Sequence, residues 1–250
     1  MTNKYKYFVA NWKMFGNIKT VNSVNKVIKI SKLRKFRKAK IVYCPPYTLI
    51  NDFVKKLKKT KVSVGAQNCH QSKSFGPFTG SINSKMIKNL GCKYIILGHS
   101  ENRKSGDTDI IINKKINSSL LNNLQIFFCI GETLKEKKEK KTKTILRNQI
   151  KKGLQNIKNF KNIIIAYEPV WSIGTGIVPK QKELAENILF IKKFLKENFN
   201  KNSIKILYGG SVNSKNIEDL SQITQIDGFL IGGASQNQNK FIDIIKKSFN

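Results

Sequence analysis

Acidic residues and arginine are both scarce in this chain. Its 250 residues include 15 Asp and Glu against 47 Lys and Arg, which gives a formal net charge of +32. The only arginines are Arg34, Arg37, Arg103 and Arg147, so lysine carries nearly all of the positive charge. A basic balance is typical of nucleic-acid binders, but these rely on arginine for paired contacts with phosphates and bases. Because Lys, Asn and Ile share A- and T-rich codons, we interpret the charge as compositional bias and expect no nucleic-acid partner; polyanion binding is the alternative.

Cysteine is also scarce, and long apolar runs are missing. Cys44, Cys69, Cys92 and Cys129 form no CxxC pair, and His70 has no second Cys–His pair to match it, so the spacing matches no common metal site. We expect free thiols in a reducing cytoplasm. No apolar run approaches the ~18 residues of a membrane span, and no secretory signal opens the chain, so we expect no membrane association.

The chain instead carries eight short β-branched or aromatic runs that alternate with longer, Lys-rich stretches of helical period. This alternation predicts βαβ units and a parallel sheet. Eight such units in 250 residues match a closed (β/α)8 TIM barrel, an α/β fold of eight parallel strands ringed by helices. The predicted strands are Tyr5–Ala10, Lys40–Cys44, Val62–Ala66, Tyr94–Leu97, Ile126–Ile130, Ile163–Tyr167, Ile204–Leu207 and Gly228–Ile231. The predicted helices are 17–32, 47–58, 82–90, 108–122, 135–157, 181–198 and 237–249.

No linker or break in composition divides the chain, so we predict a single barrel domain over residues 1–250. A doubly wound open sheet is the alternative. It usually shows a GxGxxG motif after its first strand, where this chain has Asn11-Trp12-Lys13.

Polar residues and glycines gather directly after the predicted strands. In a barrel these strand ends lie on one face, which is where barrel active sites are built. We therefore expect these residues to converge on one site. They are Asn11 and Lys13, Gly98-His99-Ser100-Glu101, Gly131-Glu132, Glu168, Gly209-Gly210-Ser211 and Gly232-Gly233.

Two kinds of chemistry meet in this set. The glycine doublets after the last two strands lie at the usual phosphate site of such barrels, where backbone N–H groups can approach an anion; alone, each doublet would indicate a plain turn. Lys13, His99 and Glu168 suit proton transfer next to a carbonyl. The carboxylate takes the proton, while a neutral imidazole and an ammonium stabilise the enediolate. Taken singly, the histidine fits a structural role and the glutamate a solvated or paired one.

The segment Trp171–Gly176 follows Glu168 closely. An aromatic and an aliphatic residue ahead of two glycines predict a mobile lid over a small ligand. An ordinary βα loop is the alternative.

At this point the chain resembles the triosephosphate isomerase family almost from end to end, in the order and spacing of many motifs. The matching stretches are Asn11-Trp12-Lys13, Cys44-Pro45-Pro46, Gly65-Ala66-Gln67-Asn68, Phe78-Thr79-Gly80, Leu97-Gly98-His99-Ser100-Glu101, Cys129-Ile130-Gly131-Glu132, Ala166-Tyr167-Glu168-Pro169-Val170-Trp171, Ile173-Gly174-Thr175-Gly176, Tyr208-Gly209-Gly210-Ser211-Val212 and Gly232-Gly233-Ala234-Ser235.

The resemblance implies interconversion of dihydroxyacetone phosphate and glyceraldehyde 3-phosphate, in glycolysis and gluconeogenesis, without metal or cofactor. It assigns the proton shuttle to Glu168, the neutral electrophile to His99 and a positive charge to Lys13, with Asn11 placing the substrate. It implies a lid over Pro169–Pro179, held closed by contacts around Tyr208 and Ser211. The phosphate would bind backbone N–H groups of Gly174, Ser211, Gly232 and Gly233.

The resemblance also implies a homodimer, in which the loop 68–80 enters the neighbouring subunit and places Thr79 near its active site. The chain departs from the family here: Ser81 and Asn102 stand where a Glu–Arg pair across the interface is common. Further departures are Ser172 in place of the usual Ala, Ile177-Val178-Pro179 at the second lid hinge, and Asp107 near an expected Glu.

Two rival functions stay open at this stage. A polyanion-binding barrel would show strongly salt-dependent binding of DNA or RNA. Another phosphosugar isomerase or an aldolase is the second, and an aldolase needs a desolvated Schiff-base lysine. Lys13 is the only lysine in the predicted site, and its place just after the first strand favours an electrostatic role.

Overall fold

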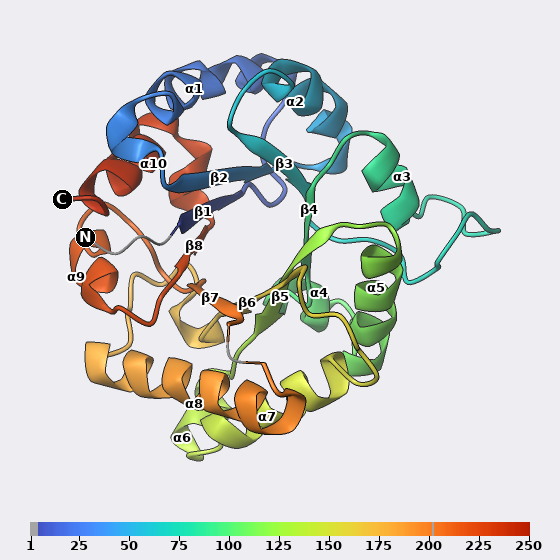
Figure 1. Cartoon of the computed structure of the whole chain (residues 1–250), viewed down its shortest axis with the longest axis vertical. Helices are drawn as coiled ribbons and strands as arrows, with labels where there is room; N and C mark the ends of the chain where they lie inside the picture. Colours follow the sequence, from blue (N-terminus) through green and yellow to red (C-terminus); the bar gives the residue numbers. More distant parts are fainter. Residues whose placement is uncertain (1–4, 202) are drawn as a thin grey trace.

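A closed barrel of eight parallel strands forms the centre of the computed structural model, which describes residues 5–201 and 203–250 (Figure 1). Each strand pairs with the next along the chain, and the last pairs with the first. The predicted barrel is confirmed, and the doubly wound open sheet is wrong, because the ring leaves no unpaired edge. The strands are β1 (Lys6–Asn11), β2 (Ala39–Cys44), β3 (Ser63–Ala66), β4 (Tyr94–Leu97), β5 (Gln125–Ile130), β6 (Ile163–Tyr167), β7 (Lys205–Tyr208) and β8 (Gly228–Ile231).

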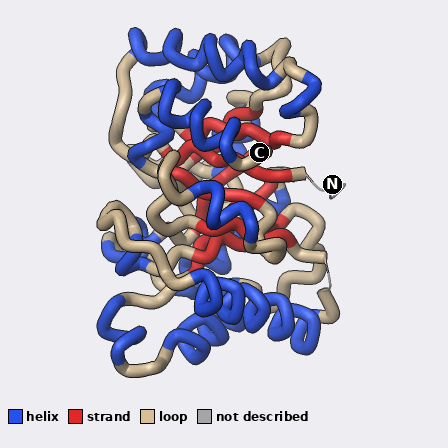
Figure 2. Tube along the Cα trace, turned by 90° about the vertical axis from the view of Figure 1, so that its left-hand side faces the viewer, coloured by secondary structure: helices blue, strands red, loops and turns tan. Residues whose placement is uncertain are grey.

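Helices surround the strands, which lie in the middle of the molecule in the side view (Figure 2). The α-helices are α1 (Asn25–Ser31), α2 (Ile50–Leu57), α3 (Ser84–Asn89), α4 (Ser100–Lys104), α5 (Asp109–Leu121), α6 (Leu134–Lys138), α7 (Thr142–Gly153), α8 (Gln181–Phe199), α9 (Ile217–Gln222) and α10 (Gln238–Lys247). Short 3-10 turns are η1 (Ile18–Val24), η2 (Arg34–Phe36), η3 (Tyr47–Leu49), η4 (Val170–Ser172) and η5 (Gly233–Gln236). No helix in the described part of the chain has the length and apolar content needed to cross a membrane.

The sequence pattern was wrong about several helices. The helix predicted over 135–157 is divided into α6 and α7, because Lys140 has a φ of 56°, a left-handed conformation through which an α-helix cannot continue. The first stretch of the helix predicted over 17–32 is the 3-10 turn η1, capped by the Asn17 side chain. Helices α4 and α9 were not predicted, since five and six residues are too few to show a helical period.

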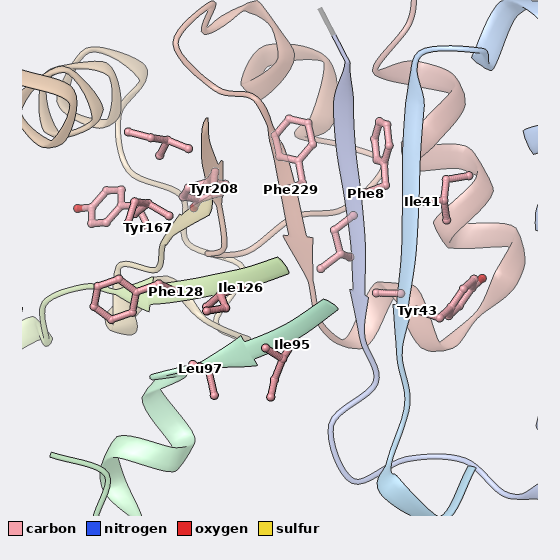
Figure 3. Packing of buried hydrophobic residues seen from close by; sticks show 14 of the residues in the cluster. Phe8, Ile41, Tyr43, Ile95, Leu97, Ile126, Phe128, Tyr167, Tyr208 and Phe229 are labelled. Atoms are coloured by element: carbon pink, nitrogen blue, oxygen red, sulfur yellow. The ribbon is translucent and has the colours of Figure 1, made fainter. Parts of the chain in front are cut away.

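Alternate residues of most strands pack into two separate apolar cores, and β3 contributes only to the larger one. Phe8 belongs to a large core that also contains helix residues such as Phe53 and therefore lies between strands and helices (Figure 3). Tyr7 and Val9 belong to a second core made only of strand residues, as expected for the inside of a barrel. Both faces of these strands are thus apolar along most of their length, so the polar side chains of the site are placed where the strands end.

Candidate active site

One cavity of about 240 Å³ at the carboxyl ends of the strands brings together all the residues to which the resemblance assigns catalysis or substrate binding. The expectation that every polar residue and glycine after a strand would line it was wrong for Gly98, Ser100, Glu101, Gly131 and Glu132. Loops after β1, β4, β6, β7 and β8 contribute to it. The roles assigned to these residues stay predictions, but their convergence is observed. The lining residues are Asn11, Lys13, His99, Glu168, Ile173, Gly174, Gly209, Gly210, Ser211, Val212, Asn213, Leu230, Gly232, Gly233 and Ala234.

The backbone after β1 holds Lys13 in an unusual conformation. Its φ of 55° is uncommon for a residue with a side chain. Two hydrogen bonds stabilise it: the Lys13 N–H donates to Asn11 Oδ1 at 3.1 Å, and Gln67 Nε2 donates to the Lys13 carbonyl at 2.9 Å. The Lys13 ammonium then lies 2.5 Å from Glu101 Oε1. This conformation aims the ammonium toward the start of α4.

The charge of Glu101 is favoured by this contact. Partial burial raises the pKa of Glu101, but the hydrogen bond from Lys13 and the surrounding positive charges outweigh it and leave that pKa below its ordinary value. Glu101 is therefore an anion that helps to orient Lys13.

His99 lies at the N-terminus of α4 and is buried. Its Nδ1 accepts the backbone N–H of Glu101 at 3.2 Å. An imidazolium has no nitrogen that can accept, so this bond identifies a neutral ring with its proton on Nε2. The Nε2 atom lies 3.6 Å from Glu168 Oε1, too far for a hydrogen bond. The Nε2–H group is thus available to an oxygen atom in the cavity.

Glu168 follows β6 and is 2% exposed. Its N–H donates to the Ile130 carbonyl at 2.7 Å, which continues the pairing of β6 with β5. Burial raises the pKa of Glu168, and neighbouring groups, among them the Ser100 amide, only partly oppose this. A carboxylate that is costly to keep ionised is a stronger base than an exposed one.

Glycines leave the room that Glu168 occupies. A Cβ at Gly209 would lie 2.7 Å from Glu168 Cγ, closer than real Cβ contacts come. A Cβ at Gly131 would overlap the Glu168 carbonyl. Gly209 is therefore required by the position of the Glu168 side chain, and Gly131 by the position of the Glu168 backbone.

The other side of the cavity is formed largely by backbone. Gly174, Ser211, Gly232 and Gly233 line it, as predicted for a phosphate site. A Cβ at Gly232 would lie 3.3 Å from Lys13 Cε, so this side of the cavity adjoins the ammonium. Backbone N–H groups next to a positive charge form a suitable environment for an anion.

The predicted lid, Pro169–Pro179, has an exposed tip and a buried base. Residues 174–177 are exposed, while Ser172 and Pro179 are buried. Trp171 Nε1 donates to Glu132 Oε1 at 2.8 Å. Only glycine residues tolerate a positive φ at no steric cost, and Gly174 and Gly176 have φ values of 73° and 78°.

Several side chains that shape the site had no role assigned from the sequence. Glu101 orients Lys13, Gln67 holds the backbone of Lys13, Glu132 holds Trp171, and Ser172 contacts Tyr208. All of them lie in or next to the motifs that carry the resemblance, and that position was the available signal. Among the described residues, no three His, Cys, Asp or Glu side chains are grouped so that they could hold a metal ion.

One departure from the family pattern forms a buried ion pair. Asp107 contacts the Lys115 ammonium at 2.6 Å, and both side chains are largely buried. Asn68 Oδ1 accepts from the same ammonium at 3.0 Å. The aspartate therefore supplies the negative charge for Lys115 near the position where the family pattern has a glutamate.

Comparisons with known proteins agree with this geometry. The family model described as triosephosphate isomerase matches residues 6–248. The triosephosphate isomerases of Thermodesulfovibrio yellowstonii and Dictyoglomus turgidum are each 39% identical to the chain, and each alignment covers 96% of this chain and 98% of the relative. A crystal structure of triosephosphate isomerase from Bartonella henselae superimposes with a TM-score of 0.87 at 32% identity, covering 97% of this chain and 98% of that one. The chain therefore belongs to the triosephosphate isomerase family.

Proposed function

We propose that the chain interconverts dihydroxyacetone phosphate and D-glyceraldehyde 3-phosphate through an enediol(ate), as a cytoplasmic enzyme of glycolysis and gluconeogenesis that acts as one barrel domain over residues 1–250. The observation that carries the proposal is the convergence of three groups in one cavity with glycine loops. These groups are a buried carboxylate at Glu168, a neutral imidazole at His99 and the Lys13 ammonium.

In the proposed mechanism, Glu168 removes the proton from C1 of the ketose and returns it to C2. Burial makes the carboxylate a competent base, as derived above. The His99 Nε2–H group donates to the oxygen that becomes negative, and the Lys13 ammonium stabilises the same charge. A glutamate base with a neutral histidine is the arrangement already known for this family.

The phosphate group is proposed to bind the backbone N–H groups of Gly174, Ser211, Gly232 and Gly233. Such binding holds the substrate at its unreactive end, and the carbon atoms then lie toward Glu168 and His99. Asn11, which lines the same cavity, helps to place the substrate.

A coupled assay for glyceraldehyde 3-phosphate tests the proposal. Purified protein with dihydroxyacetone phosphate should form the aldose in the presence of a chelator and without an added cofactor. Absence of turnover would contradict the proposal. Trapping of a substrate adduct on Lys13 by borohydride would favour the aldolase, and tight, salt-dependent DNA or RNA binding without turnover would favour the polyanion binder.

We further propose a homodimer in which the segment 68–80 of each subunit enters the other and brings Thr79 near its Asn11 and His99. This segment, between β3 and α3, extends away from the barrel (Figure 1). It exposes Phe75 and Phe78, which are 62% and 47% exposed. Apolar side chains on a projecting loop are suited to burial in a partner.

The interface should be sensitive to salt. Ser81 and Asn102 supply no charge pair across it, and each subunit carries a formal charge of +32. Self-repulsion acts over a Debye length of ~10 Å at 0.1 M salt. We expect the dimer to dissociate more readily at low ionic strength, as measured by sedimentation at several chloride concentrations. A dimer that tightens at low salt would contradict this expectation.

A further inference from the structure

A buried hydroxyl at the base of the lid contacts three groups at once. The Oγ atom of Ser172 lies 2.5 Å from the Ile177 carbonyl, 3.0 Å from the Tyr208 hydroxyl and 3.2 Å from the Ser211 backbone nitrogen. Ser172 has no exposed surface. The Oγ atom therefore joins both arms of the lid to the loop after β7.

The direction of each hydrogen bond follows from the partners. The Ile177 carbonyl can only accept, so the Ser172 hydroxyl donates its single proton there. The Tyr208 hydroxyl must then donate to Ser172, and the Ser211 N–H donates as well. A hydroxyl has one donor and two acceptor positions, so the hydrogen-bonding capacity of Ser172 is fully used.

One of these partners belongs to the proposed phosphate site. The Ser211 N–H is one of the four backbone donors assigned to the substrate phosphate, and Ser211 lines the cavity. In this structure the amide donates instead to Ser172 Oγ. A phosphate oxygen and the serine hydroxyl therefore compete for the same proton.

The neighbouring glycine leaves room for this arrangement. A Cβ at Gly210 would lie 2.7 Å from Ser172 Oγ and would overlap the Tyr208 hydroxyl. No other residue type could stand there with Ser172 and Tyr208 in their present positions.

We propose that Ser172 is a positioning residue whose hydroxyl stands in for a phosphate oxygen at the Ser211 amide and links phosphate binding to release of the lid. The proposal rests on the phosphate site given above. A phosphate dianion accepts a hydrogen bond more strongly than a neutral hydroxyl does, so the phosphate replaces Ser172 at the amide. The displaced hydroxyl is the one that holds Ile177, and the tie between the arms of the lid and the β7 loop weakens when the phosphate arrives.

Inhibition by inorganic phosphate tests this competition. For Ser172→Ala, which frees the Ser211 amide, the inhibition constant should fall roughly fivefold relative to wild type, the factor expected for one neutral hydrogen bond that no longer has to be exchanged. The KM for the triose phosphate should fall with it. A merely structural role of Ser172 would leave phosphate affinity unchanged or weaken it.

Thr175→Ala is the matched control. Within the part of the chain that the structure describes, the Thr175 hydroxyl bonds only groups of the lid, among them the carbonyls of Trp171 and Ser172 at 3.2 Å. Its loss perturbs the lid without freeing the Ser211 amide, so the phosphate inhibition constant should stay within about twofold of wild type, less than the effect of one hydrogen bond. Ser172→Cys, with a weaker acceptor, should fall between wild type and Ser172→Ala and keeps the test available if the alanine variant does not fold.

The possible failures are distinguishable. An inhibition constant that is equal or higher in both Ser172 variants overturns the stand-in role alone. An equal fall of the phosphate inhibition constant in Thr175→Ala also overturns the stand-in role, because the effect would then come from loosening the lid. If inorganic phosphate does not inhibit the wild-type enzyme competitively, the proposed phosphate site itself is wrong.

Discussion

The two sides of the cavity present different groups to a ligand, side chains on one and backbone on the other. The side formed by the loops after β1 and β4 and by the residue that directly follows β6 carries three ionisable side chains, Lys13, His99 and Glu168. The side formed by the lid and the loops after β7 and β8 is mostly glycine and backbone. We call them the side-chain half and the backbone half.

The difference lies in what keeps each half in place. On the side-chain half, Glu101 contacts Lys13 and its amide fixes the ring of His99. On the backbone half, the donors are fixed by the loop conformation, and the lid is the part with an exposed tip. Misplacement of a reacting group costs rate, whereas loss of a phosphate donor costs binding. The two halves should therefore fail in different ways when they are altered.

The largest effect is expected from shortening Glu168 to Asp. The change withdraws the carboxylate by about one C–C bond, and a misplacement of ~1 Å can cost on the order of 100-fold in rate. We expect kcat to fall by this factor while inhibition by inorganic phosphate stays within about twofold, since no backbone-half group is touched. Steady-state kinetics measures both. A near-normal kcat would show that Glu168 is not the base.

Acid should inactivate the enzyme through Glu168, the base of the side-chain half. Because burial raises the pKa of Glu168, the carboxyl becomes protonated at a pH above its ordinary value of 4.5. A protonated carboxyl cannot act as the base, so kcat/KM should fall ~10-fold per pH unit below that raised pKa. The profile is corrected for the substrate phosphate, whose second pKa is about 6.

Glu132→Gln is the control for this assignment. Burial also raises the pKa of Glu132, but this carboxyl contacts Trp171 and Tyr167 and does not line the cavity. The acid limb should keep its position in this variant. If the acid limb of the kcat/KM profile shifts in Glu132→Gln, Glu168 is not the group whose protonation causes that limb.

A smaller effect concerns the charge that surrounds both halves. With a net charge of +32, the summed field can raise the encounter rate with a dianion by ~10-fold at low salt. We expect kcat/KM to fall as sodium chloride rises, while kcat stays nearly flat. Replacing the exposed Lys151 and Lys152 of α7 by Gln should reduce the salt slope and leave kcat intact. A kcat/KM that does not depend on salt would show that the charge has no role in substrate encounter and reflects compositional bias alone.

The sequence predicts the side-chain half well because its residues directly follow strands. Strand ends are easy to locate from β-branched runs, and β4 and β6 begin and end where the pattern placed them. The glycines at 209 and 210 were predicted as a phosphate loop, but their close contacts with Glu168 and Tyr208 depend on packing between β6 and β7.

What the sequence could not predict are features set by three-dimensional contacts. The Lys13–Glu101 pair joins residues 88 positions apart. Contacts of the lid around Tyr208 were expected from the resemblance, but the Ser172 hydroxyl that makes one, 36 positions away, was not. The division of 135–157 at Lys140 depends on one backbone conformation that no periodic pattern records. Short helices such as α9 are stabilised by packing on the barrel rather than by their own period.

The most direct test of the division between the halves is Gly209→Ala. Gly209 lies on a loop of the backbone half, but its added methyl group would press on Glu168, the base of the side-chain half. Its own N–H donates to the Tyr167 carbonyl at 2.8 Å and is no phosphate donor. We predict that kcat falls by ~10-fold or more, while the inhibition constant for inorganic phosphate stays within about twofold of wild type. Phosphate binding that weakens as much as kcat falls would contradict the account, because the two halves would then not be separable.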